Sequence, residues 1–268
     1  MKVSASDKKL TEKEYKILFT TFQRFLDTYE NSQESFEVME DIITLRAGFL
    51  IDRVISNLRL DFDKALGLLK NHNDFTTEYE RQQRNILIAA INNLVDFAVA
   101  EEYRMTEDFP ESYSGDKERG LFNEVFEKYN LNYATQENQD VSYAAGMAAW
   151  WLTIPSDSIV TFMTQADERV RPWHLSHEGL SFTKGNFPPD LIPPIEWGCR
   201  CFLITDGFSS VIGSLYTHKE KVNTNPIFRE SLATCGRIFS DEHPYFKQEI
   251  PGSYKAIGDK IKQKLYAL

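Results

Sequence analysis

The stretch T-E-K-E-Y-K-I-L-F-T-T-F-Q-R-F-L-D-T-Y (Thr11–Tyr29) decides the structure of the first part of the chain. Its large apolar residues recur at spacings of three and four, which places them on one face of a helix; they are Tyr15, Leu18, Phe19, Phe22, Phe25, Leu26 and Tyr29. The opening T-E-K-E has the form of a capping box, in which Thr11 and Glu14 would satisfy free backbone N–H groups at the helix start. The pattern therefore predicts a helix from Thr11 to about Asn31.

Two more helical segments extend outward from this stretch. Residues 35–69 repeat the same spacing, with a break predicted near residues 57–61, and residues 76–103 form a third amphipathic segment. His72 and Asn73 between them predict a turn. Because no strand signal interrupts these segments, we expect residues 1–105 to form a helical N-terminal region whose helices pack on one another.

The second half of the chain has a different residue pattern from the first. Residues 106–139 are rich in turn formers and predict a linker followed by a short helix from about Gly120 to Tyr129. Residues 140–206 predict a small mixed domain, with a helix over about residues 141–151 and a helix or strand end over residues 158–164.

Cys201–Thr205 (C-F-L-I-T) predicts a strand bounded by Gly198 and Gly207, whereas Pro188-Pro189 and Pro193-Pro194 exclude regular structure. Residues 207–268 predict a C-terminal extension with one helix over residues 252–267. The expected fold class is α+β, with an N-terminal helical region followed by a small mixed α/β domain with short strands.

Composition narrows the possible partners. The chain of 268 residues carries 30 basic and 40 acidic residues, for a net charge of −10. Non-specific DNA binding depends on Lys and Arg neutralising phosphates, so the charge disfavours it, although a local basic patch stays open. Most of the acid excess falls in the first half, which predicts either a solvated face or a surface that docks on a basic protein. We expect no membrane association, because no apolar run reaches membrane-spanning length and residues 1–10 are polar.

The chemistry-bearing residues gather in two nearby stretches. These are T-Q-A-D-E-R-V-R-P-W-H-L-S-H-E-G-L-S-F (Thr164–Phe182) and P-P-I-E-W-G-C-R-C (Pro193–Cys201). The chain has only one cysteine outside them, Cys235, and too few for a disulfide framework, so reduced thiols are expected. Three hypotheses compete for this region.

The first hypothesis is a metal site. Thiolate and imidazole are ligands that suit zinc, and His174, Cys199 and Cys201 supply three of them. His177 or Asp167 would be the fourth ligand. The second hypothesis is nucleophilic catalysis, with a Cys thiolate activated by His174 and oriented by Asp167.

The third hypothesis is structural and requires no cofactor. Asp167, Arg169 and Arg171 would form a charge-assisted hydrogen-bond network that fixes a loop, with His174 as a satisfied partner and the two cysteines as small buried side chains. We take this as the leading interpretation, because a domain of turns and short strands leaves many polar groups to be paired.

These two stretches resemble the signature of the Mu F-like minor head proteins of tailed bacteriophages. The resemblance rests on D-E-R-V-R-x-x-H (Asp167–His174), Gly179 five residues later, the Pro-Pro pair, and the closing C-R-C with Arg200 at its centre. It covers about residues 140–246 and is strongest over residues 162–201, so residues 140–206 would be the Mu F-like core domain. Some relatives carry Cys where this chain has Arg171 and His174, and this chain departs from that four-Cys form.

The resemblance implies a non-enzymatic, internal component of a phage or prophage head. Such a protein would act with the portal protein and other capsid proteins in procapsid assembly or DNA ejection. It would be made in the cytoplasm of the bacterial host and end in the interior of the virion head. The alternative is a Cys/His-dependent or metal-dependent enzyme, or a toxin-like effector, carried by a phage. An open cleft at Cys199 or Cys201 would favour the enzyme, and a closed cluster would favour the structural role.

Overall fold

The computed structural model describes residues 5–70, 77–113, 116–205 and 224–267. The chain divides into two compact units that interleave along the sequence. The sheet unit comprises residues 54–90 and 140–240, and the helical unit comprises residues 2–53, 91–139 and 241–268. Over the described residues, no helix combines the length and hydropathy that crossing a bilayer requires.

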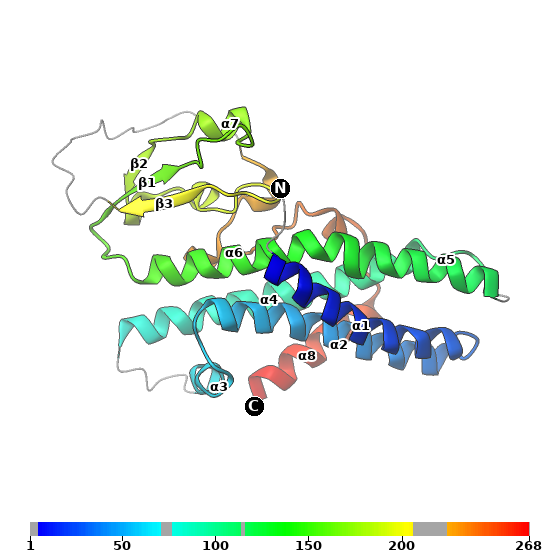
Figure 1. The fold of residues 1–268 in the computed structure, drawn as a ribbon. Coiled ribbons are helices and arrows are strands. Elements are labelled where there is room, and N and C mark those ends of the chain that lie inside the picture. Colours follow the sequence, from blue (N-terminus) through cyan, green and yellow to red (C-terminus); the bar gives the residue numbers. More distant parts are fainter. Residues whose placement is uncertain (1–4, 71–76, 114–115, 206–223, 268) are drawn as a thin grey trace. The chain divides into compact units, whose positions relative to one another are not determined.

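Long helices supply most of the helical unit (Figure 1). They are α1 (Ala5–Asp27), α2 (Ser32–Asn57), α4 (Glu78–Glu107), α5 (Asp116–Glu127), α6 (Ala134–Leu152) and α8 (Gly252–Ala267), and the short π-helix η1 (Lys128–Tyr133) joins α5 to α6. Parts of α2, α4 and α6 belong to the sheet unit. Aromatic rings fill the core between α1 and α5, where the ring centroids of Phe22 and Phe126 lie 4.1 Å apart. Gly258 brings α8 close to α4, because a Cβ at this position would lie 3.2 Å from Val99.

The start of α1 differs from the prediction. The helix begins at Ala5, so Thr11 and Glu14 lie inside it and form no capping box. Both side chains are buried on the same face as Leu18 and Phe22. Their spacing of three and four continues the apolar stripe, and a buried Arg53 pairs with both of them. Thr11 and Glu14 thus belong to the core, where the guanidinium of Arg53 donates hydrogen bonds to both.

The helices of residues 32–107 follow the predicted pattern more closely. The break predicted near residues 57–61 is confirmed, because α2 ends at Asn57 and α3 (Phe62–Lys70) begins after it, with Arg59 at a φ of 58°. Phe62 continues the apolar spacing predicted over residues 35–69 but is 63% exposed. The turn predicted at His72 and Asn73 lies outside the described residues.

The helical region after residue 115 is longer than predicted. Asp116–Leu152 runs without a break through α5, η1 and α6, where the sequence predicts two short helices. Four consecutive polar residues, from Glu137 to Asp140, are buried within α6. Their polarity interrupts the apolar pattern, which is why periodicity places the helix start too late. The C-terminal helix predicted over residues 252–267 is confirmed as α8.

The sheet unit contains a three-stranded antiparallel sheet of order β2-β1-β3 (Figure 1). Central β1 (Ile159–Met163) pairs with β2 (Ser181–Thr183) and β3 (Phe202–Thr205), with Phe162 opposite Leu203. The strand predicted over residues 201–205 is confirmed as β3, and residues 158–164, for which the sequence left a helix or a strand end open, contain β1; Gly207 lies outside the described residues. The unit also contains short helices: α7 (Pro172–Leu175) and the 3-10 helices η2 (Lys184–Asn186), η3 (Pro189–Leu191), η4 (Pro226–Phe228) and η5 (Leu232–Thr234). A further 3-10 helix, η6 (Pro244–Lys247), belongs to the helical unit. The fold class is α+β, as predicted.

Candidate metal centre

His174 is positioned by a short turn that follows β1. Arg171 has an extended backbone with a φ of −66° and a ψ of 137°, and Pro172 occupies the first position of α7. Proline suits that position because its fixed φ is helical and its missing N–H would have no partner there. The turn directs His174 inward, and only 2% of this residue is exposed.

The two cysteines are positioned by a second turn, which α6 holds in place. Gly198 has a φ of 61°, a left-handed conformation that favours glycine, and its N–H donates to the Asp140 carboxylate at 3.0 Å. The Cys199 N–H donates to the Glu196 carbonyl at 3.0 Å. Beyond the turn, the Tyr143 hydroxyl donates to the carbonyl of Cys201, just before β3 begins. Asp140 and Tyr143 thus fix both ends of the C-R-C segment.

The imidazole of His174 and the two thiols converge on one point. One ligand atom from each of His174, Cys199 and Cys201 lies within 4.8 Å of the other two, and all three residues are buried. His174 Nδ1 lies 3.1 Å from Cys201 Sγ and 3.9 Å from Cys199 Sγ. Tetrahedral zinc with ordinary Zn–N and Zn–S bonds would separate such atoms by about 3.6 Å. The three residues therefore lie close enough together to bind a metal ion.

The thiols are electrostatically coupled. Burial by itself raises the pKa of Cys199, but hydrogen bonds from Cys201 and His174 outweigh it and hold that pKa well below its usual range. The hydrogen bond with Cys199 raises the pKa of Cys201, and burial raises it further. The pair thus retains one proton, which a metal ion would displace because the thiolate is the binding form.

The other ring nitrogen of His174 is in an unusual environment. Its Nε2 is buried and has no hydrogen-bond partner among the described residues. The Trp173 ring lies edge-on to the imidazole at 4.0 Å between centroids. Metal-binding histidines usually donate the second N–H to an oxygen, so packing against Trp173 takes the place of that hydrogen bond here.

Neither residue predicted as a fourth ligand joins this group. His177 is buried, but it packs near Phe162 and Trp173, with ring centroids 6.2 and 5.9 Å away, and is not part of the metal-ligating group. Asp167 is partly exposed and forms a two-pronged ion pair with Arg200 at 2.6 and 2.8 Å. Among the described residues, the group of potential metal ligands has three members.

The predicted polar network exists with different partners. Asp167 pairs with the side chain of Arg200, and it also accepts a hydrogen bond from the backbone N–H of Arg169 at 3.1 Å. Arg171 instead donates to the Trp197 carbonyl at 2.8 Å. Arg200 holds the pKa of the Asp167 carboxyl below its usual range through their hydrogen bond. Since Asp167 is not buried, it joins the two stretches at the surface of the unit and does not anchor its core.

Gly179 has a backbone role. Its φ of 82° lies in the left-handed region, and its N–H donates to the Phe162 carbonyl at 2.8 Å. A side chain here would strain the turn that connects α7 to β2. The glycine of the motif therefore allows the chain carrying His174 to return to the sheet.

Sequence reasoning missed the residues outside the motif that support the centre. Asp140 and Tyr143 hold the cysteine turn through hydrogen bonds to Gly198 and Cys201. Asp140 and Tyr143 lie three residues apart, which puts them on one face of a helix, and this spacing was the available signal.

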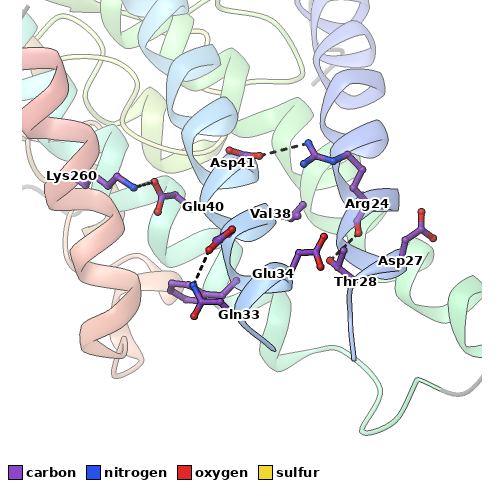
Figure 2. A pocket seen from close by; sticks show the side chains of 11 residues that line it. Arg24, Asp27, Thr28, Gln33, Glu34, Val38, Glu40, Asp41 and Lys260 are labelled. Atoms are coloured by element: carbon purple, nitrogen blue, oxygen red, sulfur yellow. Dashed lines mark hydrogen bonds and ion pairs between the residues drawn. The ribbon is translucent and has the colours of Figure 1, made fainter. Parts of the chain in front are cut away.

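An acidic groove of about 800 Å³ lies in the helical unit (Figure 2). Figure 2 shows Arg24 of α1 facing Asp41 of α2, at 3.7 Å, and Lys260 of α8 reaching Glu40. The Arg24–Asp41 pair is exposed, and such pairs contribute little to stability. The groove has the properties of a solvated face, and we assign it no ligand.

Comparisons with known proteins add a single short similarity. No protein family matches the chain, and no solved structure matches it. A stretch of 42 residues is 48% identical to an uncharacterized protein of Methanocaldococcus jannaschii. That stretch is 16% of this chain and 7% of the archaeal protein, so the similarity spans a small part of either and carries no activity with it.

Proposed function

We propose that this chain is a minor head protein of a tailed bacteriophage or prophage, and that a zinc ion on His174, Cys199 and Cys201 fastens its sheet unit. The proposed role is structural: an internal capsid component that acts with the portal protein in procapsid assembly or DNA ejection. The observation that carries the proposal is the convergence of the three ligand residues from the two halves of the motif.

Contacts between the two motif halves support the head-protein proposal. The halves, residues 164–182 and 193–201, meet through His174 and Cys201, through Asp167 and Arg200, and through Arg171 and Trp197. These are residues by which the chain resembles the Mu F-like minor head proteins. Two motifs that form one joined element are a more specific resemblance than two separate short matches.

The donor set supports zinc. Two thiolates and one imidazole favour zinc over magnesium or calcium, which prefer oxygen ligands. Burial supports a structural role over a catalytic one, since Cys199 and Cys201 are each only 2% exposed and a substrate would need access to the ion. A metal-dependent enzyme is the alternative, and the missing fourth protein ligand is the feature that favours it.

Metal analysis of the purified protein should find one zinc ion per chain. His174→Ala and Cys201→Ser should each lower zinc content, because two ligands hold zinc far more weakly than three. Cys235→Ser is the matched control, since this exposed thiol is not part of the group. Zinc retained in full by both ligand variants would refute the metal centre.

Co-expression with the portal protein of the same phage genome should yield a complex that survives affinity purification and size-exclusion chromatography. A control pull-down with an unrelated portal protein should capture none. Turnover of a substrate by the pure protein, lost in Cys199→Ser, would instead favour the enzyme. Absence of any complex with the cognate portal and capsid proteins would overturn the head-protein proposal.

A further inference from the structure

A cluster of ionisable side chains is buried in the helical unit. Arg46 of α2 donates to both carboxylate oxygens of Glu101 in α4, at 2.7 and 3.2 Å. The same guanidinium donates to Glu137 at 3.1 Å and to Asn138 at 2.7 Å, both in α6. We call this group, with Glu102 and Asn130, the Arg46 cluster.

Carboxyl groups outnumber the cation in this cluster. Glu101, Glu102 and Glu137 are each at most 4% exposed, and Arg46 is the guanidinium that pairs with two of them. Burying an ionised carboxylate without a partner is so costly that the group takes up a proton instead. One guanidinium cannot offset three carboxylates, so some of them must be neutral in the folded protein.

Glu102 is the group with the poorest compensation. Its Oε2 accepts one long hydrogen bond of 3.4 Å from Asn130 Nδ2, and its Oε1 has no partner among the described residues. The Oδ1 of Asn130 is also buried without a partner there. Both atoms are acceptors, so neither can satisfy the other while Glu102 is ionised. A protonated Glu102 would carry an O–H group, which is the donor that this pair of atoms lacks.

Charged and titratable groups face Glu102 from several elements. They are Glu101 on the same helix, Arg46 on α2 and Tyr254 on α8, beside the polar Asn130 of η1. Glu137 of α6 lies near Glu101, and Tyr245 of η6 donates to Glu137 at 3.0 Å. Arg46 is the only cation among them and already holds Glu101 and Glu137. The surroundings of Glu102 therefore favour its neutral form.

We propose that Glu102 and Glu137 bind protons in the folded helical unit, and that release of these protons as the pH rises weakens the packing of α4 against α6. The device goes beyond the structural role proposed above, because it makes the stability of the helical unit depend on pH without any ligand.

The direction of the effect follows from linkage. Burial, with the nearby Glu101 charge, raises the pKa of Glu102 to about 8, and burial also raises the pKa of Glu137 well above its usual range. In the unfolded chain both groups ionise near pH 4.5. Between pH 4.5 and about 8 the folded state binds more protons, so stability is greatest at low pH and falls as the pH rises.

Urea unfolding at pH 6, 7 and 8 tests the proposal with Glu102→Gln. Glutamine keeps the shape of the protonated carboxyl and cannot ionise. In the wild type, Glu102 should lower the folding equilibrium constant by nearly 10-fold from pH 6 to pH 7, and by less from pH 7 to pH 8 as the group approaches half-ionisation. Glu102→Gln should remove that contribution, so the variant should be about 50-fold more stable relative to wild type at pH 8 than at pH 6.

Glu107→Gln is the matched control, because it makes the same change at an exposed position of α4. Its pH dependence should follow that of the wild type. An unchanged pH dependence in Glu102→Gln would overturn the proposal.

A second measurement does not depend on how well the variant folds. The infrared spectrum of the wild-type protein at pH 6 should contain the carbonyl stretch of a buried protonated carboxyl group, and this band should fade as the pH is raised above 8. Absence of the band at pH 6 would overturn the proposal, and a cation bound beside an ionised Glu102 would give that result.

Discussion

Replacing Arg46 with methionine should lower the free energy of unfolding by about 3–5 kcal/mol at neutral pH, which is the cost of removing one partner from a buried ion pair. The guanidinium is 1% exposed and donates to Glu101, Glu137 and Asn138. Methionine has a similar length but removes the guanidinium from all three acceptors, although Glu137 keeps its hydrogen bond from the Tyr245 hydroxyl. Urea denaturation at pH 7.5 measures the loss.

Two further variants separate the charge from the volume of Arg46. Arg46→Lys should also be destabilising, because a single ammonium cannot reproduce the forked donation to Glu101. Arg24→Met is the matched control: Arg24 is exposed and lies 3.7 Å from Asp41, so its loss should cost less than about 1 kcal/mol. A loss from Arg46→Met no larger than that from Arg24→Met would show that the cluster contributes little to stability.

Removal of the metal should produce the second large effect. When free zinc is 1,000 times its dissociation constant, binding adds about 4 kcal/mol to the stability of the folded state. A strong chelator should therefore lower the unfolding midpoint, and added zinc should restore it. The ligands must be deprotonated to bind, so the benefit of zinc should shrink as the pH falls.

The chelator effect should be localised and specific. Hydrogen exchange should accelerate in residues 159–205, where β1, α7 and β3 surround the candidate centre. Cys201→Ser, which removes a ligand, should unfold at the same midpoint with and without chelator. A wild-type protein that loses its zinc and keeps its midpoint would show that the ion does not fasten the unit.

Patterns of apolar spacing predicted the helices and strands where one face of an element is apolar. Leu18, Phe22 and Phe25 of α1 are buried as expected, and α8 has the bounds that the sequence predicts. Periodicity failed where polar residues enter the core. The pattern at Thr11 and Glu14 predicts a helix start because such residues usually cap one, but here Arg53 of α2 donates hydrogen bonds to both of them.

The sequence predicts which residue types form the candidate site, but it predicts less well which of these side chains contact one another. His174, Cys199 and Cys201 were identified because few residue types bind zinc, and the fold brings them together. The fourth-ligand candidates lie outside the group, because ligand chemistry does not encode distance: His177 packs near aromatic rings, and Asp167 pairs with Arg200. The Arg46 cluster was missed, since its members lie as far apart in the chain as Arg46 and Glu137.

The interleaving of the two units has a consequence for biosynthesis. Residues 241–268 complete the helical unit, in which Lys262 pairs with Asp96 and Tyr254 packs edge-to-face against Phe36 at 5.6 Å between ring centroids. Residues 241–268 are translated after the other segments of this unit, so α1 and α2 must wait for α8 while the whole intervening segment is translated. Nascent chains therefore expose apolar helix faces until residues 241–268 have left the ribosome, and chaperone demand should be highest just before that point.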